Sequence, residues 1–267
     1  MKTRLITTAV GVPFLIFVLV VRGWFAELML VLFTLTALYE YYRALKARYD
    51  VCTWGGYLAA IAMWPLSLFM GVIDPLLLVA AAMGISMSGV MLRRQPSFPD
   101  AAVSMYPLLT CLMPMSMLMV MLNRDFGLVP GIALITMTFG ISFGSDGFAY
   151  LVGRTWGRHK LCPSVSPKKT VEGAVGGLFG GVLLAQLVRL FFVHALNTPM
   201  PGIPAALLLG LLGSYAGQIG DLTASLLKRY TGIKDYGNIF PGHGGVMDRF
   251  DSVIFVLIVM YCYTLVL

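Results

Sequence analysis

Long apolar stretches alternate with short polar segments along almost the whole chain. Each of nine such stretches is close to the roughly 20 residues that a helix needs to cross the hydrocarbon core of a bilayer. The stretches cover residues 5–22, 24–44, 54–72, 75–92, 101–122, 127–152, 171–196, 202–228 and 249–267. The pattern predicts an all-α polytopic membrane protein with about nine transmembrane helices. Almost nothing separates the third stretch from the fourth, so we expect these two to form a tight hairpin.

Composition agrees with this pattern. Hydrophobic residues make up 58% of the 267 residues, charged residues make up only 12%, and mean hydropathy is +0.85. A soluble domain carries about 25% charged residues, so this chain has too little charge for a water-exposed surface. Disorder, collagen, a coiled coil and a small disulfide scaffold are excluded by the same numbers. We expect a single membrane domain over residues 1–267, with N-terminal helices in 1–126 and the helices and cytoplasmic loops that carry the chemistry in 127–267.

Basic residues fall on alternate polar segments, which places sixteen of the nineteen on one side of the membrane. Only Arg22 and Arg124 lie on the other side, and Arg189 lies inside the seventh stretch. Because cytoplasmic loops carry the excess of Lys and Arg, the pattern predicts a cytoplasmic N-terminus and an outside C-terminus. These loops explain the net charge of +7 without a nucleic-acid partner. No cleavage site of the A-x-A kind follows the first stretch, so we expect a retained signal anchor.

Five acidic residues of the second half lie at the predicted cytoplasmic ends of four helices. An acid at the bilayer centre costs about 2.5–3.5 kcal/mol on insertion scales, so such residues usually face a polar cavity. Interfacial placement or structural pairing is the alternative for each acid taken alone. In the first half, Glu40 is interpreted as an interfacial acid that pairs with Arg43, three residues later. The five acids at these helix ends are Asp146, Glu172, Asp221, Asp248 and Asp251.

The segment 225–251 combines acids, bases and glycines just before and within the last stretch. Asp248 and Asp251 are three residues apart and share a helical face, where acids also suit the positive end of the helix dipole. His243 lies between glycines with little apolar packing, which favours a polar contact to a phosphate or to a metal-bound group. The other polar candidates here are Ser225, Lys228, Arg229, Lys234, Asp235 and Arg249.

A second polar segment precedes the seventh stretch. Ser166, Lys168 and Lys169 place hydroxyl and ammonium groups at a predicted helix N-terminus, where backbone N–H groups bind anions. The lysines are also explained as positive charges of a cytoplasmic loop. Carboxylates that can hold divalent cations thus lie next to bases that can hold phosphates, a pairing that suits phosphoryl or nucleotidyl transfer. A soluble triphosphate would come from the cytosol and a lipid phosphate from the leaflet.

A resemblance to a known family lies in these residues. The chain is similar to the phosphatidate cytidylyltransferases, also called CDP-diacylglycerol synthases, over segment 225–251. This segment begins Ser-Leu-Leu-Lys-Arg, continues through Lys234 and Asp235, and ends Phe-Pro-Gly-His-Gly-Gly-Val-Met-Asp-Arg-Phe-Asp. Shorter likenesses occur at residues 145–150, 166–173, 176–177 and 220–221. Together they cover about residues 140–251.

The resemblance implies transfer of CMP from CTP to phosphatidic acid, which gives CDP-diacylglycerol and pyrophosphate, with Mg²⁺ as cofactor. It implies a nine-span chain, usually a homodimer, in the bacterial inner (plasma) membrane, with phosphatidic acid taken from the cytoplasmic leaflet. The family uses a paired-metal centre on acids that match Asp221 and Asp248, and K⁺ is a candidate for the second ion.

The resemblance also suggests roles for the other polar residues. Catalytic candidates are Asp221, Asp248, His243, Lys234, Asp235 and Asp251. Substrate-binding candidates are Ser166, Lys168, Lys169, Glu172, Ser225, Lys228, Arg229, Arg249 and Asp146.

Two other functions stay open. A CTP-dependent polyprenol or lipid kinase would transfer the γ-phosphate, so its products would be CDP and a phospholipid instead of pyrophosphate and a CDP-lipid. A transporter of an anionic solute would need a pathway open to both faces of the membrane. The gathering of polar residues on one predicted side argues against the transporter.

The distribution of basic residues makes the topology testable. We expect a reporter fused to the N-terminus to be active on the cytoplasmic side and a reporter fused to the C-terminus to be active outside, because sixteen basic residues lie on one set of loops. Paired cytoplasmic and periplasmic reporters at each end measure this. Cytoplasmic signal from both ends would require an even number of spans and would contradict the assignment.

Overall fold

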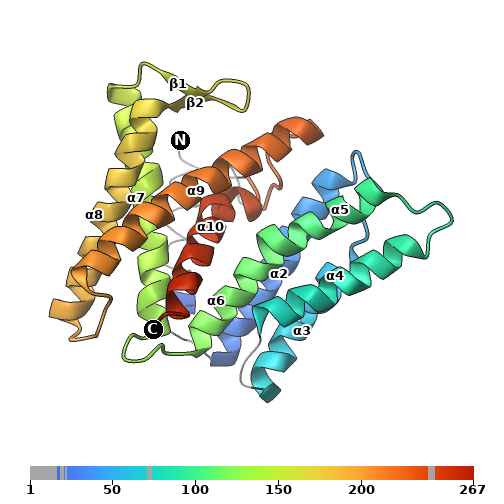
Figure 1. The fold of residues 1–267 in the computed structure, drawn as a ribbon, viewed down its shortest axis with the longest axis horizontal. Helices are drawn as coiled ribbons and strands as arrows, with labels where there is room; N and C mark the ends of the chain where they lie inside the picture. The colour runs from blue at the N-terminus through green and yellow to red at the C-terminus, as the bar shows by residue number, and fades with distance from the viewer. Residues whose placement is uncertain (1–16, 19–20, 22, 71–73, 240–243) are drawn as a thin grey trace. The chain divides into compact units, whose positions relative to one another are not determined.

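A computed structural model describes residues 17–18, 21, 23–70, 74–239 and 244–267, and most of them are helical (Figure 1). The helical elements are α2 (Gly23–Leu45), α3 (Trp54–Met70), α4 (Pro75–Met91), α5 (Phe98–Pro107), the π-helical turn η1 (Leu108–Leu112), α6 (Met113–Asn123), α7 (Gly131–Thr155), α8 (Val171–Ala195), α9 (Ile203–Thr231) and α10 (Met247–Thr264). Among the described residues the one sheet consists of β1 (Lys160–Cys162) and β2 (Ser166–Thr170).

Eight of the nine predicted stretches correspond to helices, with ends that differ by at most four residues from the prediction. The stretch 101–122 corresponds to α5, η1 and α6, which follow one another without a break. The first stretch, 5–22, falls almost entirely outside the described residues. Within the part of the chain that the structure describes, five segments are long and apolar enough to cross a membrane: α2, α5 to α6, α7, α8 and α9. The chain is therefore a polytopic membrane protein, whereas the count of nine spans and the orientation stay predictions.

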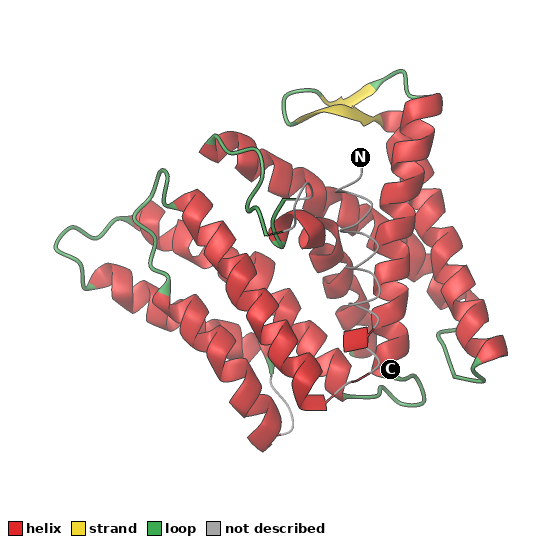
Figure 2. Cartoon of the chain, turned by 180° about the vertical axis from the view of Figure 1, so that it is seen from behind, coloured by secondary structure: helices red, strands yellow, loops and turns green. Residues whose placement is uncertain are grey.

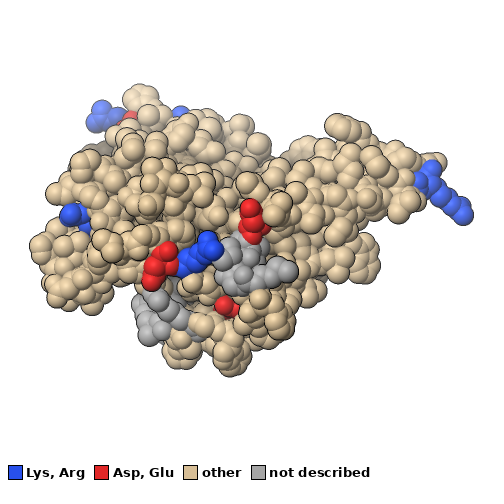
Figure 3. Space-filling model, turned by 60° about the horizontal axis from the view of Figure 1, so that its bottom comes forward, with Lys and Arg blue, Asp and Glu red and all other residues tan. Residues whose placement is uncertain are grey.

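The remaining helices are shorter or more charged. Both α3 and α4 are apolar helices of 17 residues, at the lower end of the range of about 17–25 residues for a spanning helix. α10 has 18 residues and carries two acids and an arginine in its first two turns. Elsewhere charge is sparse, and Figure 3 shows Lys, Arg, Asp and Glu at only a few places on the face that it draws.

Two compact units make up the chain, and each is described by itself. Unit 1 comprises residues 1–123 and 230–250, and unit 2 comprises residues 124–229 and 251–267. In unit 1, α3 packs against α4, as expected for the third and fourth stretches. A Cβ atom on Gly55 of α3 would overlap the carbonyl oxygen of Ala82 in α4, so glycine is needed for this close approach.

In unit 2, α7 and α8 lie side by side along most of their length (Figures 1 and 2). A Cβ atom on Gly180 of α8 would lie 2.5 Å from the carbonyl oxygen of Gly144 and 2.5 Å from the Cβ atom of Phe148, both in α7. Small residues allow this approach, which matters because lipid supplies no hydrophobic force between helices. The same holds for α9 against α10, where a Cβ atom on Gly220 would meet the ring of Phe255.

A β-hairpin lies in the connection between α7 and α8 (Figure 2). Its strands are antiparallel, with Lys160 opposite Thr170 and Cys162 opposite Ser166 and an irregularity between these pairs. The sequence predicts a loop of an all-α protein here, and the two strands show that this part of the prediction is wrong. Its polar residues lack the alternation of apolar and polar side chains that identifies a strand.

Close packing between α7 and α8 gives a stability prediction. We expect Gly180→Ala to lower the midpoint of thermal unfolding in detergent, because the new methyl group would force the two helices apart at a cost of about 1–3 kcal/mol. Gly84→Ala in α4 is the matched control, since a Cβ atom there meets nothing within 4 Å. An equal effect of both substitutions would contradict the packing argument.

Candidate functional site

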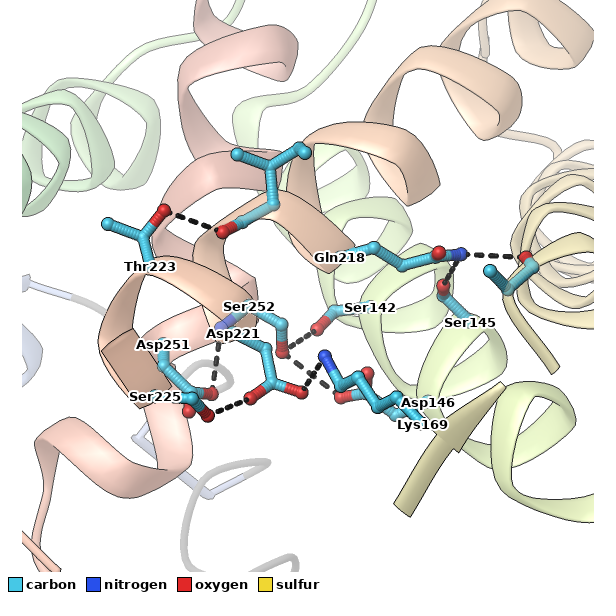
Figure 4. A network of polar contacts seen from close by, with 12 residues as sticks. Ser142, Ser145, Asp146, Lys169, Gln218, Asp221, Thr223, Ser225, Asp251 and Ser252 are labelled. Carbon is cyan, nitrogen blue, oxygen red and sulfur yellow. Dashed lines mark hydrogen bonds and ion pairs between the residues drawn. The ribbon is translucent and has the colours of Figure 1, made fainter. Parts of the chain in front are cut away.

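Three acids from three helices gather in unit 2. Asp146 lies on α7, Asp221 on α9 and Asp251 on α10, and their side chains point toward one small region (Figure 4). We call these three residues the carboxylate cluster. Each of them is predicted from the sequence, and the fold brings them together from positions that are 30 to 105 residues apart. Neighbouring anions repel one another, so such a cluster favours a bound cation or positively charged side chain.

The hairpin supplies a positive charge to this cluster. Lys169 lies on β2, and its Nζ atom is 2.6 Å from Oδ2 of Asp221 (Figure 4). Both side chains are partly shielded from solvent, with 27% and 30% of their surface exposed. Ser225, one turn after Asp221 on α9, places its hydroxyl 3.4 Å from the other carboxylate oxygen. Lys169, Asp221 and Ser225, all predicted site residues, are therefore in contact.

Two serines that the sequence analysis missed complete the polar network. Ser252 donates its hydroxyl to Oδ2 of Asp146 at 3.0 Å, and its backbone N–H donates to Oδ1 of Asp251 at 2.9 Å. Ser142 lies 3.0 Å from the Ser252 hydroxyl. Because the single proton of Ser252 is given to Asp146, Ser142 acts as donor to Ser252. The available signal was position: Ser142 lies one helical turn before Asp146, and Ser252 follows Asp251.

Gln218 fixes the helices that carry the cluster. Its side-chain nitrogen donates to the carbonyl oxygen of Ala174 in α8 at 3.0 Å and lies 3.4 Å from the hydroxyl of Ser145 in α7 (Figure 4). One side chain of α9 thus connects three helices close to Asp146 and Asp221. A polar crosslink of this kind is valuable inside a membrane, where water does not compete for the donors.

Glu172 secures the base of the hairpin. Its carboxylate accepts the backbone N–H groups of Arg158 at 3.1 Å and His159 at 3.2 Å, and it lies 2.6 Å from Nδ1 of His159. Thr170 caps α8, since its hydroxyl accepts the backbone N–H of Gly173 at 3.2 Å. These contacts fix both ends of the segment that presents Lys169.

The other predicted residues of this region take varied positions. Ser166 pairs with Cys162 in the sheet, and Lys168 is exposed. Arg229, also exposed, directs Nε toward the carbonyl oxygen of Val165 at 3.4 Å. Lys228 is half-buried.

In unit 1 the predicted ligand Asp248 is buried, with 8% of its surface exposed. Its Oδ2 atom accepts the backbone N–H groups of Tyr236 at 2.7 Å and Gly245 at 3.0 Å. Lys234, Asp235 and Arg249 are exposed in the same unit. His243 lies outside the described residues.

Glu40 has a different role from the one expected. It is buried, and its two carboxylate oxygens accept the backbone N–H groups of Val246 at 3.1 Å and Met247 at 2.8 Å. Arg43 donates to the carbonyl oxygen of Tyr236. The expected pairing of Glu40 with Arg43 is therefore replaced by contacts of both residues with the segment before α10. Sequence analysis could not find this, because the partners lie about 200 residues away.

The site suits a magnesium ion in its chemistry, although it is not a complete protein cage. Among the residues that the structure describes, no three or more His, Cys, Asp or Glu side chains are arranged as a metal site. Mg²⁺ usually binds through one or two carboxylates, with water and substrate phosphates as its other ligands, so the oxygen donors present fit this ion. The ammonium of Lys169 beside Asp221 already places a positive charge against this carboxylate.

Comparison with known proteins gives matches to one family. The model of the family described as "Cytidylyltransferase family" matches residues 2–267. The chain is 44% identical over 131 residues to the phosphatidate cytidylyltransferase of Bacillus subtilis, a match that covers 49% of this chain and 47% of the relative. It is 47% identical over 128 residues to the phosphatidate cytidylyltransferase of Staphylococcus haemolyticus, a match that covers 48% of this chain and 47% of the relative. The chain thus spans about half the length of the curated relatives that it matches.

Proposed function

Because the chain belongs to the cytidylyltransferase family, we propose that it transfers CMP from CTP to phosphatidic acid, giving CDP-diacylglycerol and pyrophosphate. The observation that carries the proposal is the contact of Lys169 with Asp221 inside the carboxylate cluster. In this contact a lysine, which can bind phosphate, lies beside a carboxylate, which can bind a cation. The resemblance of segment 225–251 and the names of the relatives support the choice of substrates.

The chemistry needs charge neutralisation more than proton transfer. The phosphate of phosphatidic acid is already an anion near neutral pH, so the nucleophile hardly needs a base. The barrier comes from repulsion between two polyanions and from charge that grows on the leaving pyrophosphate. Lys169 offsets this charge by contacting the triphosphate, and the tethered hairpin orients its ammonium group. Ser142 and Ser252 hold the Asp146 carboxylate in position by hydrogen bonds.

Asp221 would hold a magnesium ion, which would supply further positive charge to the triphosphate. Asp146 and Asp251 are the other carboxylates of unit 2 that are available to such an ion or to its water ligands. Asp248 belongs to unit 1, so its share in a paired-metal centre rests on the sequence resemblance. The second ion K⁺, the homodimer and the location in a bacterial inner membrane rest on the resemblance as well.

Product analysis tests the proposed reaction. Purified protein in detergent micelles with phosphatidic acid, Mg²⁺ and CTP labelled at the α-phosphorus should yield labelled lipid and unlabelled pyrophosphate. A second reaction with γ-labelled CTP should release label as pyrophosphate, because CMP is the group transferred. Label from the γ-position in the lipid would identify a lipid kinase, and the proposal would then be wrong.

The carboxylate cluster gives a matched set of variants. We expect Asp221→Asn and Lys169→Met to lower kcat by about 100-fold or more, because the first removes a carboxylate that would hold Mg²⁺ and the second removes a positive charge that offsets the phosphates. Lys160→Met is the control, since Lys160 is an exposed lysine on the other strand of the same hairpin and should keep near-normal turnover. Thermal midpoints measured on all three variants separate loss of activity from loss of fold. Folded Asp221→Asn protein with wild-type turnover would rule out a catalytic role for this carboxylate.

A further inference from the structure

Two carboxylates of unit 1 accept the backbone N–H groups of residues 245 to 247, where α10 begins, and one of them also accepts the N–H of Tyr236. Asp248 accepts those of Tyr236 and Gly245, and Glu40 accepts those of Val246 and Met247. Three consecutive N–H groups, from residues 245 to 247, are therefore bound to side-chain carboxylates. The N–H of Met247 belongs to the first turn of α10 and has no partner within the helix, and those of Gly245 and Val246 lie in the segment just before it, so these contacts satisfy donors that neither element pairs.

Glycine residues make room for the Glu40 carboxylate. A Cβ atom on Gly237 or on Gly245 would overlap Oε1 of Glu40. Glycine is therefore needed at both positions because of a side chain of α2, about 200 residues earlier in the chain. Glu40 itself has only 2% of its surface exposed, so its negative charge is available to these backbone groups and hardly at all to solvent.

Neighbouring residues of α2 hold the same segment. Arg43, one helical turn after Glu40, donates to the carbonyl oxygen of Tyr236. Tyr41 packs against Tyr236 with ring centroids 5.2 Å apart, and both rings are almost completely buried. The peptide group on either side of Tyr236 is therefore fixed, with its N–H on Asp248 and its carbonyl on Arg43.

We propose that Glu40 is a positioning residue for the reaction, which holds the start of α10 and thereby sets the orientation of the Asp248 carboxylate. The physical argument is that one oxygen of Asp248 is bound to the N–H of Gly245, next to the two N–H groups that Glu40 holds. If Glu40 releases them, the Gly245 peptide is free to rotate, and Asp248 loses one of the contacts that define its orientation. This inference rests on the proposed function, because it takes Asp248 as a member of the catalytic site.

Glu40→Gln is the main test, and it is made on the full chain in detergent. The side-chain amide keeps the size of the carboxylate, but its NH₂ group faces a backbone donor in place of an acceptor. We expect hydrogen exchange in peptides covering residues 244–250 to become faster and kcat to fall by about 10- to 100-fold, as for other residues that orient a metal-binding side chain. Glu27→Gln is the matched control, because Glu27 is a buried acid of the same helix, and it should change neither quantity.

A double variant separates positioning from general destabilisation. If Glu40 acts through Asp248, Glu40→Gln combined with Asp248→Asn should be no less active than Asp248→Asn alone, whereas independent effects would multiply. If Glu40→Gln does not accumulate, Glu40→Asp, which keeps the charge but has a shorter reach, is used in all the same measurements. Multiplying losses, or wild-type exchange at residues 244–250, would overturn the proposal. Inactive wild-type protein would reject the proposed function, and the exchange rates alone would then decide whether Glu40 holds the segment.

Discussion

Charged groups are costly in the hydrocarbon core of a bilayer, and this cost determines where acidic and basic side chains lie in the chain. With only 12% charged residues, the chain keeps its acids and bases close to helix ends and to the segments between helices. Two acids inside helices are held by defined partners, Asp221 by Lys169 and Glu40 by backbone N–H groups. Lipid supplies little drive for helix association, so glycine contacts such as that of Gly180 with Gly144 bring the helices together.

Carboxylates serve two distinct purposes in this framework. Glu40 and Glu172 accept backbone N–H groups and thereby fix the segments that lead into α10 and β1. In contrast, Asp146 and Asp221 contact side chains, namely a serine hydroxyl and an ammonium group. Side-chain partners can move aside for a ligand at small cost, whereas a backbone N–H group that loses its partner stays behind unsatisfied. Glu40 and Glu172 therefore suit positioning, and Asp146 and Asp221 suit binding.

Sequence alone predicted the helices well because their apolar stretches are long and the breaks between them are polar. It also identified Asp146, Lys169, Asp221 and Asp251, since acids and bases are rare enough here to stand out. It missed the β-hairpin, whose polar residues show no alternation. It also missed the hydrogen-bonded serines Ser142 and Ser252, since serine is common in membrane helices for other reasons. Glu40 was assigned the wrong partner because local spacing offers Arg43, whereas its contacts are formed by residues about 200 positions away.

The hairpin shows how an irregular segment becomes precise enough for chemistry. A lysine side chain has many rotamers, so Lys169 needs a backbone whose position is fixed before its ammonium group can meet Asp221 reliably. Two antiparallel strands alone would be marginal, because a single hairpin has little stability in water. Glu172 of α8 binds the backbone just before β1, and Thr170 at the end of β2 caps α8. Both ends of the hairpin are thus connected to α8, which packs along α7. The glycine contacts fix α8 against α7, and Glu172 and Thr170 fix the hairpin to α8. Together they determine the position of the Lys169 ammonium group.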